Sequence, residues 1–175
     1  MDSAISIPKK WVSLLLGRRG RGKRILEKAF NAKLKVDPSG KIEIIECPPE
    51  NYVALRNALY AISVGFAPED VTFFAEDDSA TLDIIDTKRE IPKENHRKRL
   101  LGRVIGRGGS MYTQIANALN VRIRIDDDRI GIMGHLENVQ SAVSIIRLIL
   151  SGAQFGTVYR ELERRKAALE YMEWK

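Results

Sequence analysis

The spacing of apolar and polar residues along the chain predicts short strands and amphipathic helices in a regular order. Apolar and polar residues alternate in several short runs, which is typical of half-buried strands. Elsewhere apolar residues recur at helical spacing, as Ile25, Leu26, Ala29 and Phe30 do on one helix face. In the first half of the chain we expect strand, helix, helix, strand, strand and helix at 3–7, 10–16, 20–30, 33–36, 41–46 and 49–64.

The same order recurs in the second half of the chain. The LGRRG of residues 16–20 recurs as the IGRGG of residues 105–109, an offset of 106 − 17 = 89 positions. That offset then holds from residues 30–37 onto 119–126, where one Asn and one Asp are identical. The match predicts an internal duplication. The expected strands and helices of the second copy lie at 81–86, 98–105, 109–119, 121–125, 129–133 and 136–151.

These elements predict an α+β fold class with two tandem units, each a three-stranded sheet covered by three helices on one face. A C-terminal helix follows, whose apolar residues Val158, Leu162, Leu169 and Met172 form one stripe that we expect to pack on the protein itself. The expected organisation is a first domain at 1–66, a linker with a short helix at 67–80, a second domain at 81–153, and the C-terminal helix at 154–175.

The composition narrows the class of protein. With 44% hydrophobic and 30% charged residues, the 175-residue chain can bury a core. The net charge of +6 and the pI of about 9.5 suit RNA, DNA, an anionic membrane or simply a cationic surface. Cys47 is the only cysteine, so no intramolecular disulfide can form, and no apolar run approaches the ~20 residues of a membrane span. We therefore expect a cytoplasmic protein without a membrane contact.

Both repeats of the Gly-x-x-Gly motif stand between two predicted helices. Such a loop leaves backbone N–H groups free at the start of the second helix, where the helix dipole attracts anions. Glycine allows the close approach of a phosphate, and basic side chains at the centre add charge. Beside the loop, the second helix and the next strand can form a groove for unpaired bases. Ile115 is one of the apolar residues that we expect to line this groove in the second copy. The candidate RNA-binding residues are Arg103, Ile105, Gly106, Arg107, Gly108, Gly109, Ser110, Met111, Arg122 and Arg124 in the second copy, and Gly17, Arg18, Arg19, Gly20, Arg21 and Lys23 in the first.

Two other patterns resemble catalytic motifs without completing them. Gly17, Gly22 and Lys23 nearly spell a nucleotide-binding P-loop, but Arg24 replaces the Ser or Thr that holds Mg²⁺, and a helix rather than a strand precedes Gly17. The acidic run at 126–128 has no second ligand cluster at metal-binding spacing, so a turn is the expected role. We therefore expect no enzymatic activity, no metal and no cofactor.

The arrangement of motifs resembles that of a known family. An Ile-Gly-x-x-Gly loop between helices, followed by a hairpin and a long helix, looks like a type I KH domain. The combination of GFAPED at 65–70, GRVIGRGG at 102–109, IMG at 132–134 and GTVY at 156–159 is similar to archaeal counterparts of the ribosome-assembly factor called partner of Nob-one.

The resemblance implies single-stranded RNA as the ligand, namely the 3′ region of precursor small-subunit rRNA during its maturation by a separate endonuclease. It also implies contact with the alpha subunit of translation initiation factor two. It leaves open whether both loops bind RNA or only the second. The residues alone also allow a protein-binding scaffold that holds an acidic partner on the basic loops, or a nucleotide hydrolase or nuclease, which the missing Mg²⁺ ligands disfavour.

Overall fold

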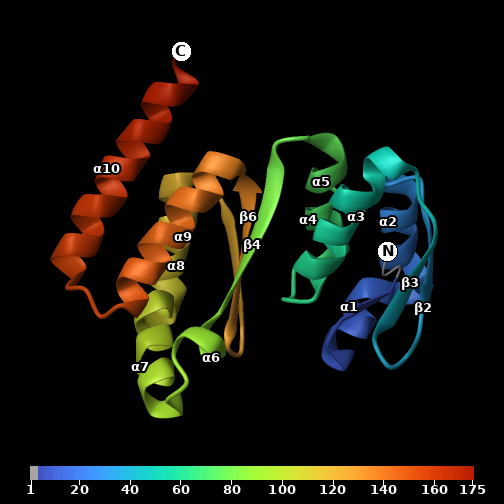
Figure 1. The fold of residues 1–175 in the computed structure, drawn as a ribbon, viewed down its shortest axis with the longest axis horizontal. Helices are drawn as coiled ribbons and strands as arrows, with labels where there is room; N and C mark the ends of the chain where they lie inside the picture. Colours follow the sequence, from blue (N-terminus) through green and yellow to red (C-terminus); the bar gives the residue numbers. More distant parts are fainter. Residues whose placement is uncertain (1–3) are drawn as a thin grey trace. The chain divides into compact units, whose positions relative to one another are not determined.

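The computed structural model describes residues 4–175, which fold as two compact units divided between Ala80 and Thr81 (Figure 1). The expected strand at 3–7 begins at Ser3, which lies outside the described residues; the described strand β1 is Ala4–Ser6.

The first unit contains a three-stranded sheet of order β1-β3-β2. Strand β3 lies in the middle and pairs antiparallel with both neighbours, with Ile5 opposite Ile42 and Val36 also opposite Ile42. Leu34, Ile42 and Ile5 are buried, so one face of the sheet carries the core beneath the helices. The elements are β1 Ala4–Ser6, α1 Val12–Leu16, α2 Arg21–Ala29, β2 Lys33–Val36, β3 Lys41–Glu46, α3 Pro49–Ile62, α4 Pro68–Val71 and α5 Phe73–Glu76, with single 3₁₀ turns at Lys9–Trp11 and Arg18–Gly20.

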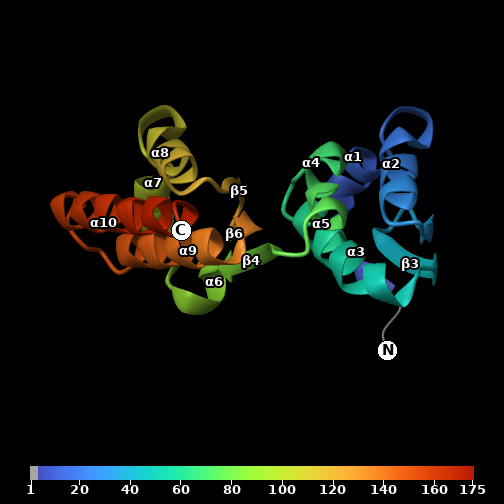
Figure 2. The ribbon, with the colours of Figure 1, turned by 90° about the horizontal axis from the view of Figure 1, so that it is seen from above.

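The second unit has the same strand arrangement, with order β4-β6-β5 and helices on one face of the sheet (Figure 2). Strands β5 and β6 pair antiparallel, with Ile123 opposite Ile132. The buried residues of the sheet and of the four long helices form one hydrophobic core. The elements are β4 Ala80–Asp86, α6 Thr87–Glu90, α7 Glu94–Ile105, a 3₁₀ turn at Arg107–Gly109, α8 Ser110–Leu119, β5 Arg122–Asp126, β6 Arg129–His135, α9 Leu136–Leu150 and α10 Phe155–Glu173.

Matching hydrogen bonds support the duplication that the sequence predicts. The Asn51 side-chain amide of α3 donates to the Phe30 carbonyl at 2.9 Å, and that of Asn138 in α9 donates to the Leu119 carbonyl at 2.9 Å. Both carbonyls end the helix that follows a GxxG loop, and the next residue is a left-handed asparagine in each copy, Asn31 with φ 49° and Asn120 with φ 50°. Gly65 and Gly152 close α3 and α9 with φ of 98° and 88°.

The two units differ most after the third helix of each copy. In the first, the short helices α4 and α5 within residues 67–80 contact α3, and α4 also contacts α2. In the second, the long helix α10 contacts α8 and α9 and buries Val158, Leu162 and Leu169 in the core. Three residues of the predicted stripe therefore pack as expected, whereas Met172 is 53% exposed near the C-terminal end of α10, beyond the part that the core covers.

Helix α7 begins four residues earlier than predicted, at Glu94 instead of Lys98, and the short helix α6 was not predicted. The side chain of Asp86 caps α6 by accepting from the N–H groups of Lys88 and Arg89. In α7, Glu94 pairs with Lys98 at 2.8 Å across one turn. A polar first turn without apolar periodicity concealed this part of the helix from the sequence pattern.

Candidate nucleic-acid interface

The two GxxG loops have the same backbone path. Gly17 and Gly106 leave the preceding helix with φ, ψ of 63°, −172° and 71°, 179°, a region that is essentially restricted to glycine. Two left-handed residues follow in each loop before the next helix begins: Arg19 and Gly20 in the first, and Gly108 and Gly109 in the second. The likeness of the two units therefore extends to the conformation of the loop.

The second loop presents free backbone donors at the start of α8. The N–H of Gly109 donates to Gly106, and the N–H of Ser110 donates to Arg107. Within the described residues, the N–H groups of Arg107 and Gly108 have no hydrogen bond. A Cβ at Gly108 would meet no atom within 4 Å, so a ligand can approach this backbone directly. Free donors at a helix N-terminus suit a phosphate group.

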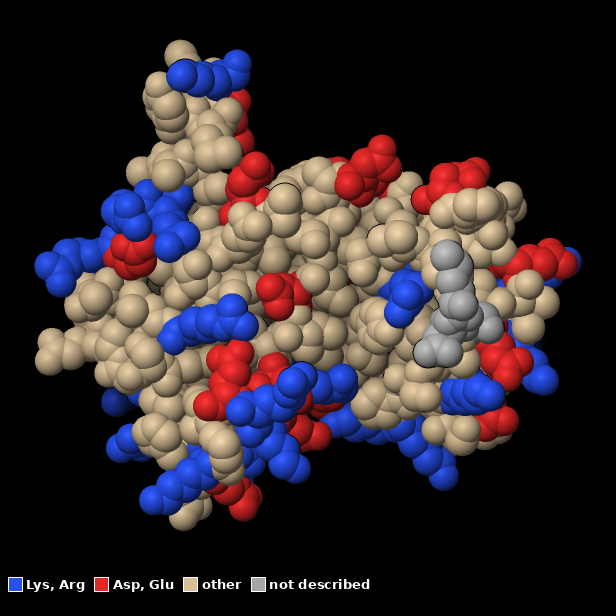
Figure 3. Space-filling model, viewed as in Figure 1, with Lys and Arg blue, Asp and Glu red and all other residues tan. Residues whose placement is uncertain are grey.

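Both loops carry exposed cations. Arg107 in the second loop and Arg18, Arg19 and Arg21 in the first are exposed, and Lys23 is half-buried. Figure 3 shows Lys and Arg side chains over α6 and α7 in the second unit, with Asp and Glu side chains among them. It also shows Lys and Arg side chains near α1 of the first unit. This charge favours an anionic partner.

Arg97 belongs to the basic run that precedes the second loop, but its side chain does not add to the exposed charge. Its side chain is buried, with 6% of the residue exposed. The guanidinium pairs with Asp128 at 2.6 Å and donates to the carbonyls of Ile91 and Pro92. It thus connects α7 to the turn between β5 and β6. Residues 127 and 128 of the acidic run form that turn, as the sequence predicted.

Arg103 is also engaged within the second unit. Its guanidinium donates to the carbonyl of Ile149 at 3.1 Å and to that of Ala153, and lies 4.6 Å from the centre of the Phe155 ring. These contacts join the last turn of α7 to the end of α9 and the start of α10. The side chain supports the helix that leads into the loop.

The candidate groove residues of the second unit differ in exposure. Ile105 is 37% exposed next to Gly106, whereas Met111 is 4% exposed and Ile115 is fully buried, so both belong to the core. Arg122 and Arg124 are exposed and alternate with the buried Ile123, which places them on the face of β5 turned away from the core. Of these candidates, Ile105 alone lies both exposed and beside the loop.

Sequence reasoning missed Tyr112, an aromatic side chain beside the second loop. A Cβ at Gly109 would lie 2.9 Å from its ring, so the ring packs directly on the loop backbone. Tyr112 is half-buried and follows the loop at the third position after Gly109. A search for aromatic residues in the first turn of the helix after the loop would have found it.

The first loop holds Arg19 in the left-handed conformation that Gly108 adopts in the second, with φ 52° and ψ 35°. The Arg24 side chain donates to the Arg19 carbonyl at 2.6 Å and so supports this backbone. Gly22 is buried in α2, where a Cβ would overlap the Leu15 carbonyl of α1. Gly22 is therefore a packing glycine, and helix α1 precedes Gly17 where a P-loop would have a strand.

Among residues 4–175, no cluster of three or more His, Cys, Asp or Glu side chains could hold a metal ion. Across the same residues, no helix is both long and apolar enough to cross a membrane.

Comparison with known proteins identifies the second unit. Residues 81–167 match the model of the second KH domain of PNO1, described as a eukaryotic type KH-domain of type I. These residues belong to the PNO1-like KH-domain family. The chain is also 29% identical over 170 residues to the KH domain-containing protein MJ0443 of Methanocaldococcus jannaschii, covering 95% of this chain and 74% of that protein.

Two further proteins extend the comparison. The RNA-binding protein pno1 of Dictyostelium discoideum is 31% identical over 105 residues, covering 59% of this chain and 44% of that protein. Dim2p in a Pyrococcus horikoshii complex of a/eIF2alpha, aDim2p and rRNA has a TM-score of 0.85 at 29% identity, covering 94% of this chain and 93% of that one. The chain spans about half the length of the PNO1 proteins that it matches.

Proposed function

We propose that this chain binds single-stranded RNA, clamping the backbone at the GxxG loop of residues 106–109. The observation that carries the proposal is the pair of free N–H groups at Arg107 and Gly108, open to solvent at the N-terminus of α8 beside an exposed guanidinium. Ile105 and Tyr112 supply apolar surface beside the clamp. Ser110, Arg103, Arg122 and Arg124 stay predicted contacts, whereas Met111 is buried in the core and is not proposed as one. The second clamp at Gly17, Arg18, Arg19, Gly20, Arg21 and Lys23 also stays a prediction, in a first unit that we propose to be a KH domain as well.

The RNA that we propose is the 3′ region of precursor small-subunit rRNA, which this protein would hold as an assembly or processing cofactor without cleaving it. Relatives named pre-rRNA-processing protein pno1 or PNO1 support the process. The solved complex with rRNA and a/eIF2alpha supports a contact with the alpha subunit of translation initiation factor two. The separate endonuclease as a partner, the domain bounds 1–66 and 81–153, and a cytoplasmic location stay predictions.

The test is the double substitution R107D/G108D. A Cβ at Gly108 points into open space and Asp tolerates a left-handed backbone, so the fold should be retained while two negative charges face the phosphate. We expect the affinity for an rRNA 3′-end oligonucleotide to fall by about 100-fold or more, measured by fluorescence anisotropy at fixed salt.

The matched control is G156D/R160D, which makes the same residue changes and the same change in formal charge on α10. A Cβ at Gly156 meets no atom within 4 Å, and Arg160 is exposed. We expect this control to bind RNA to within about three-fold of the unchanged protein. An R107D/G108D protein that binds as well as the control would disprove the clamp, and RNA cleavage by the pure protein with a divalent metal would instead favour an enzyme.

A further inference from the structure

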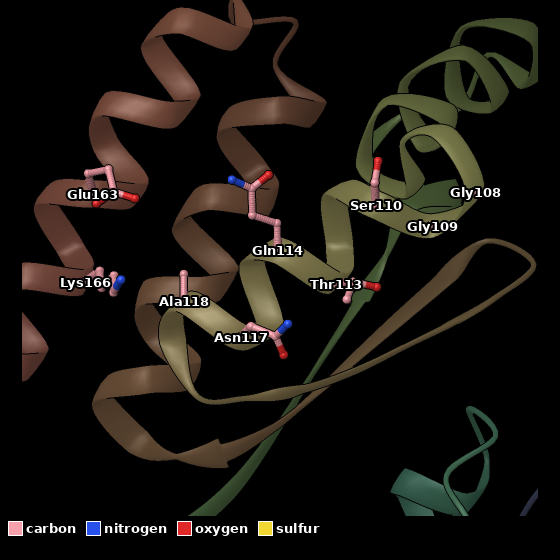
Figure 4. Close-up of a pocket in the computed structure, with 9 residues that line it drawn as sticks. All are labelled: Gly108, Gly109, Ser110, Thr113, Gln114, Asn117, Ala118, Glu163 and Lys166. Atoms are coloured by element: carbon pink, nitrogen blue, oxygen red, sulfur yellow. The ribbon is translucent and has the colours of Figure 1, made fainter.

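A pocket of about 650 Å³ opens beside the second GxxG loop, between helices α8 and α10 (Figure 4). One end is formed by the loop itself, since Gly108 and Gly109 are part of the wall. From there the pocket follows the side of α8 that faces away from the core. The remaining wall consists of Ser110, Thr113, Gln114, Asn117 and Ala118 of α8 and Glu163 and Lys166 of α10.

The side chains in this α8–α10 pocket are rich in hydrogen-bonding groups that are not used within the protein. Gln114, Asn117 and Thr113 have no side-chain hydrogen bond to any described residue, and neither do Glu163 and Lys166. Each amide offers both donors and an acceptor, Glu163 only accepts, and Lys166 only donates. A wall of this kind fits a ligand with several donors and acceptors of its own, and it does not fit an apolar helix.

We propose that the α8–α10 pocket binds one unpaired nucleotide of the RNA strand, adjacent to the nucleotides clamped at the GxxG loop. The amides of Gln114 and Asn117 and the carboxylate of Glu163 bind the edge of its base, and Lys166 binds a phosphate. This inference rests on the proposed RNA binding by the loop. Because Gly108 and Gly109 line both places, a strand held at the loop continues directly into the pocket, whose volume lies in the range of ligand sites, about 300–1,000 Å³.

Comparison of the two units supports a base-reading role. The residues of α2 equivalent to Thr113, Gln114 and Asn117, 89 positions earlier, are Arg24, Ile25 and Lys28. The first unit therefore presents two cations and an apolar side chain where the second presents two amides and a hydroxyl. Phosphate contacts supply affinity without regard to sequence, whereas neutral donors and acceptors can distinguish one base from another. The second unit therefore recognises one base in the α8–α10 pocket in addition to the bases bound in the groove beside its GxxG loop.

The test compares Q114A/N117A with unchanged protein on two RNAs. One is a tetranucleotide, the length that a KH groove clamps, and the other is an rRNA 3′-end oligonucleotide of about twelve nucleotides, within the range of single-strand binding sites. We expect the variant to bind the longer RNA about 10-fold more weakly and the tetranucleotide unchanged. With single-base changes along the longer RNA, unchanged protein should discriminate at one position where the variant does not.

The matched control N95A/Q140A removes one Asn and one Gln amide from exposed positions of α7 and α9 outside the pocket. Alanine has a higher helix propensity than either residue, so neither double variant should unfold. A second variant, K166E, should weaken binding of the longer RNA and lower its salt dependence by about one counterion.

The outcomes separate this inference from the proposed function. If Q114A/N117A and N95A/Q140A bind the longer RNA with equal affinity, the proposal that the α8–α10 pocket binds a nucleotide is wrong, even if R107D/G108D still abolishes RNA binding. Loss of a protein partner in Q114A/N117A with unchanged RNA binding also overturns it, because the pocket then belongs to a protein interface. If unchanged protein binds neither RNA, the proposed function itself fails.

Discussion

Arg19 and Gly108 occupy the same place in the two GxxG loops, and both are left-handed, with φ of 52° and 56°. For a non-glycine residue this conformation costs about 1–2 kcal/mol. The first loop carries a cation there in spite of that cost, with Arg24 hydrogen-bonded to its backbone. In the second loop, Gly108 adopts this conformation without that cost and leaves the backbone open to the close approach of a ligand. The first loop therefore presents a side-chain cation at the position where the second presents open backbone.

The helices that carry the loops are also held differently. In the first unit, Gly22 lets α2 approach the backbone of α1 closely. In the second, Met111 stands at that position, and Gly106 is the glycine in tight contact. Arg103 ties α7 to the carbonyls of Ile149 and Ala153, whereas its equivalent in the first unit is Leu14. The second loop is thus coupled to the helix α10 that forms the far wall of its pocket.

The largest contrast should come from replacing the first glycine of each loop with alanine. A Cβ at Gly106 would lie 2.7 Å from the Met111 Cβ and backbone nitrogen, whereas one at Gly17 would lie 3.2 Å from the Gly22 nitrogen. Both sites disfavour any side chain, so we expect G17A to destabilise its unit by about 2 kcal/mol and G106A by about 4 kcal/mol. Amide hydrogen exchange, followed separately in α3 and in α9, measures the free energy of unfolding of each unit.

The control for this pair is G102A, because a Cβ at Gly102 in α7 meets no atom within 4 Å. It should stabilise the second unit by about 0.5–1 kcal/mol, since alanine favours a helix interior. Equal destabilisation by G17A and G106A would mean that the contact with Met111 does not distinguish the loops.

The second contrast concerns Arg103, a predicted RNA contact that is hydrogen-bonded inside its unit. If support of the loop is its main role, R103K should resemble R103L, because lysine cannot bind two carbonyls and a ring with one planar group. We expect both to destabilise the second unit by about 2 kcal/mol, measured by the same hydrogen exchange in α9. If R103K instead keeps RNA affinity that R103L loses, with stability unchanged, Arg103 is a phosphate contact.

The fold could be predicted from the sequence largely because the two halves of the chain repeat the same pattern and can be aligned with each other. The offset of 89 residues aligned the loops, and the identical Asn31 and Asn120 are indeed both left-handed. The sheets followed from alternating residues such as those of β2 and β5. Helix α6 and the first turn of α7 could not be found this way, because they are polar and depend on a cap and an ion pair.

The candidate site was harder to predict than the fold. Sequence spacing identified the loops, but it could not show that Arg97 pairs with Asp128 from a distant turn or that Met111 is buried. Such contacts depend on how α7 packs against elements far along the chain. The α8–α10 pocket was missed for the same reason, because Glu163 and Lys166 approach α8 only after α10 has folded back along it. Local patterns report which residues are polar, and packing decides which polar residues share a site.

The smallest contrast exchanges the residues that differ between the loops. R19G should stabilise the first unit by about 1 kcal/mol, because it relieves a left-handed arginine while the Arg24 hydrogen bond, made to the backbone, is kept. G108R should destabilise the second unit by a similar amount, but it adds a cation over free N–H groups and should strengthen RNA binding several-fold at low salt, with a steeper salt dependence. The measurements are hydrogen exchange for stability and fluorescence anisotropy across a salt series for affinity. If G108R weakens RNA binding at every salt concentration, the bare glycine backbone is what the phosphate requires, and the charge of the first loop then serves a partner other than the RNA backbone.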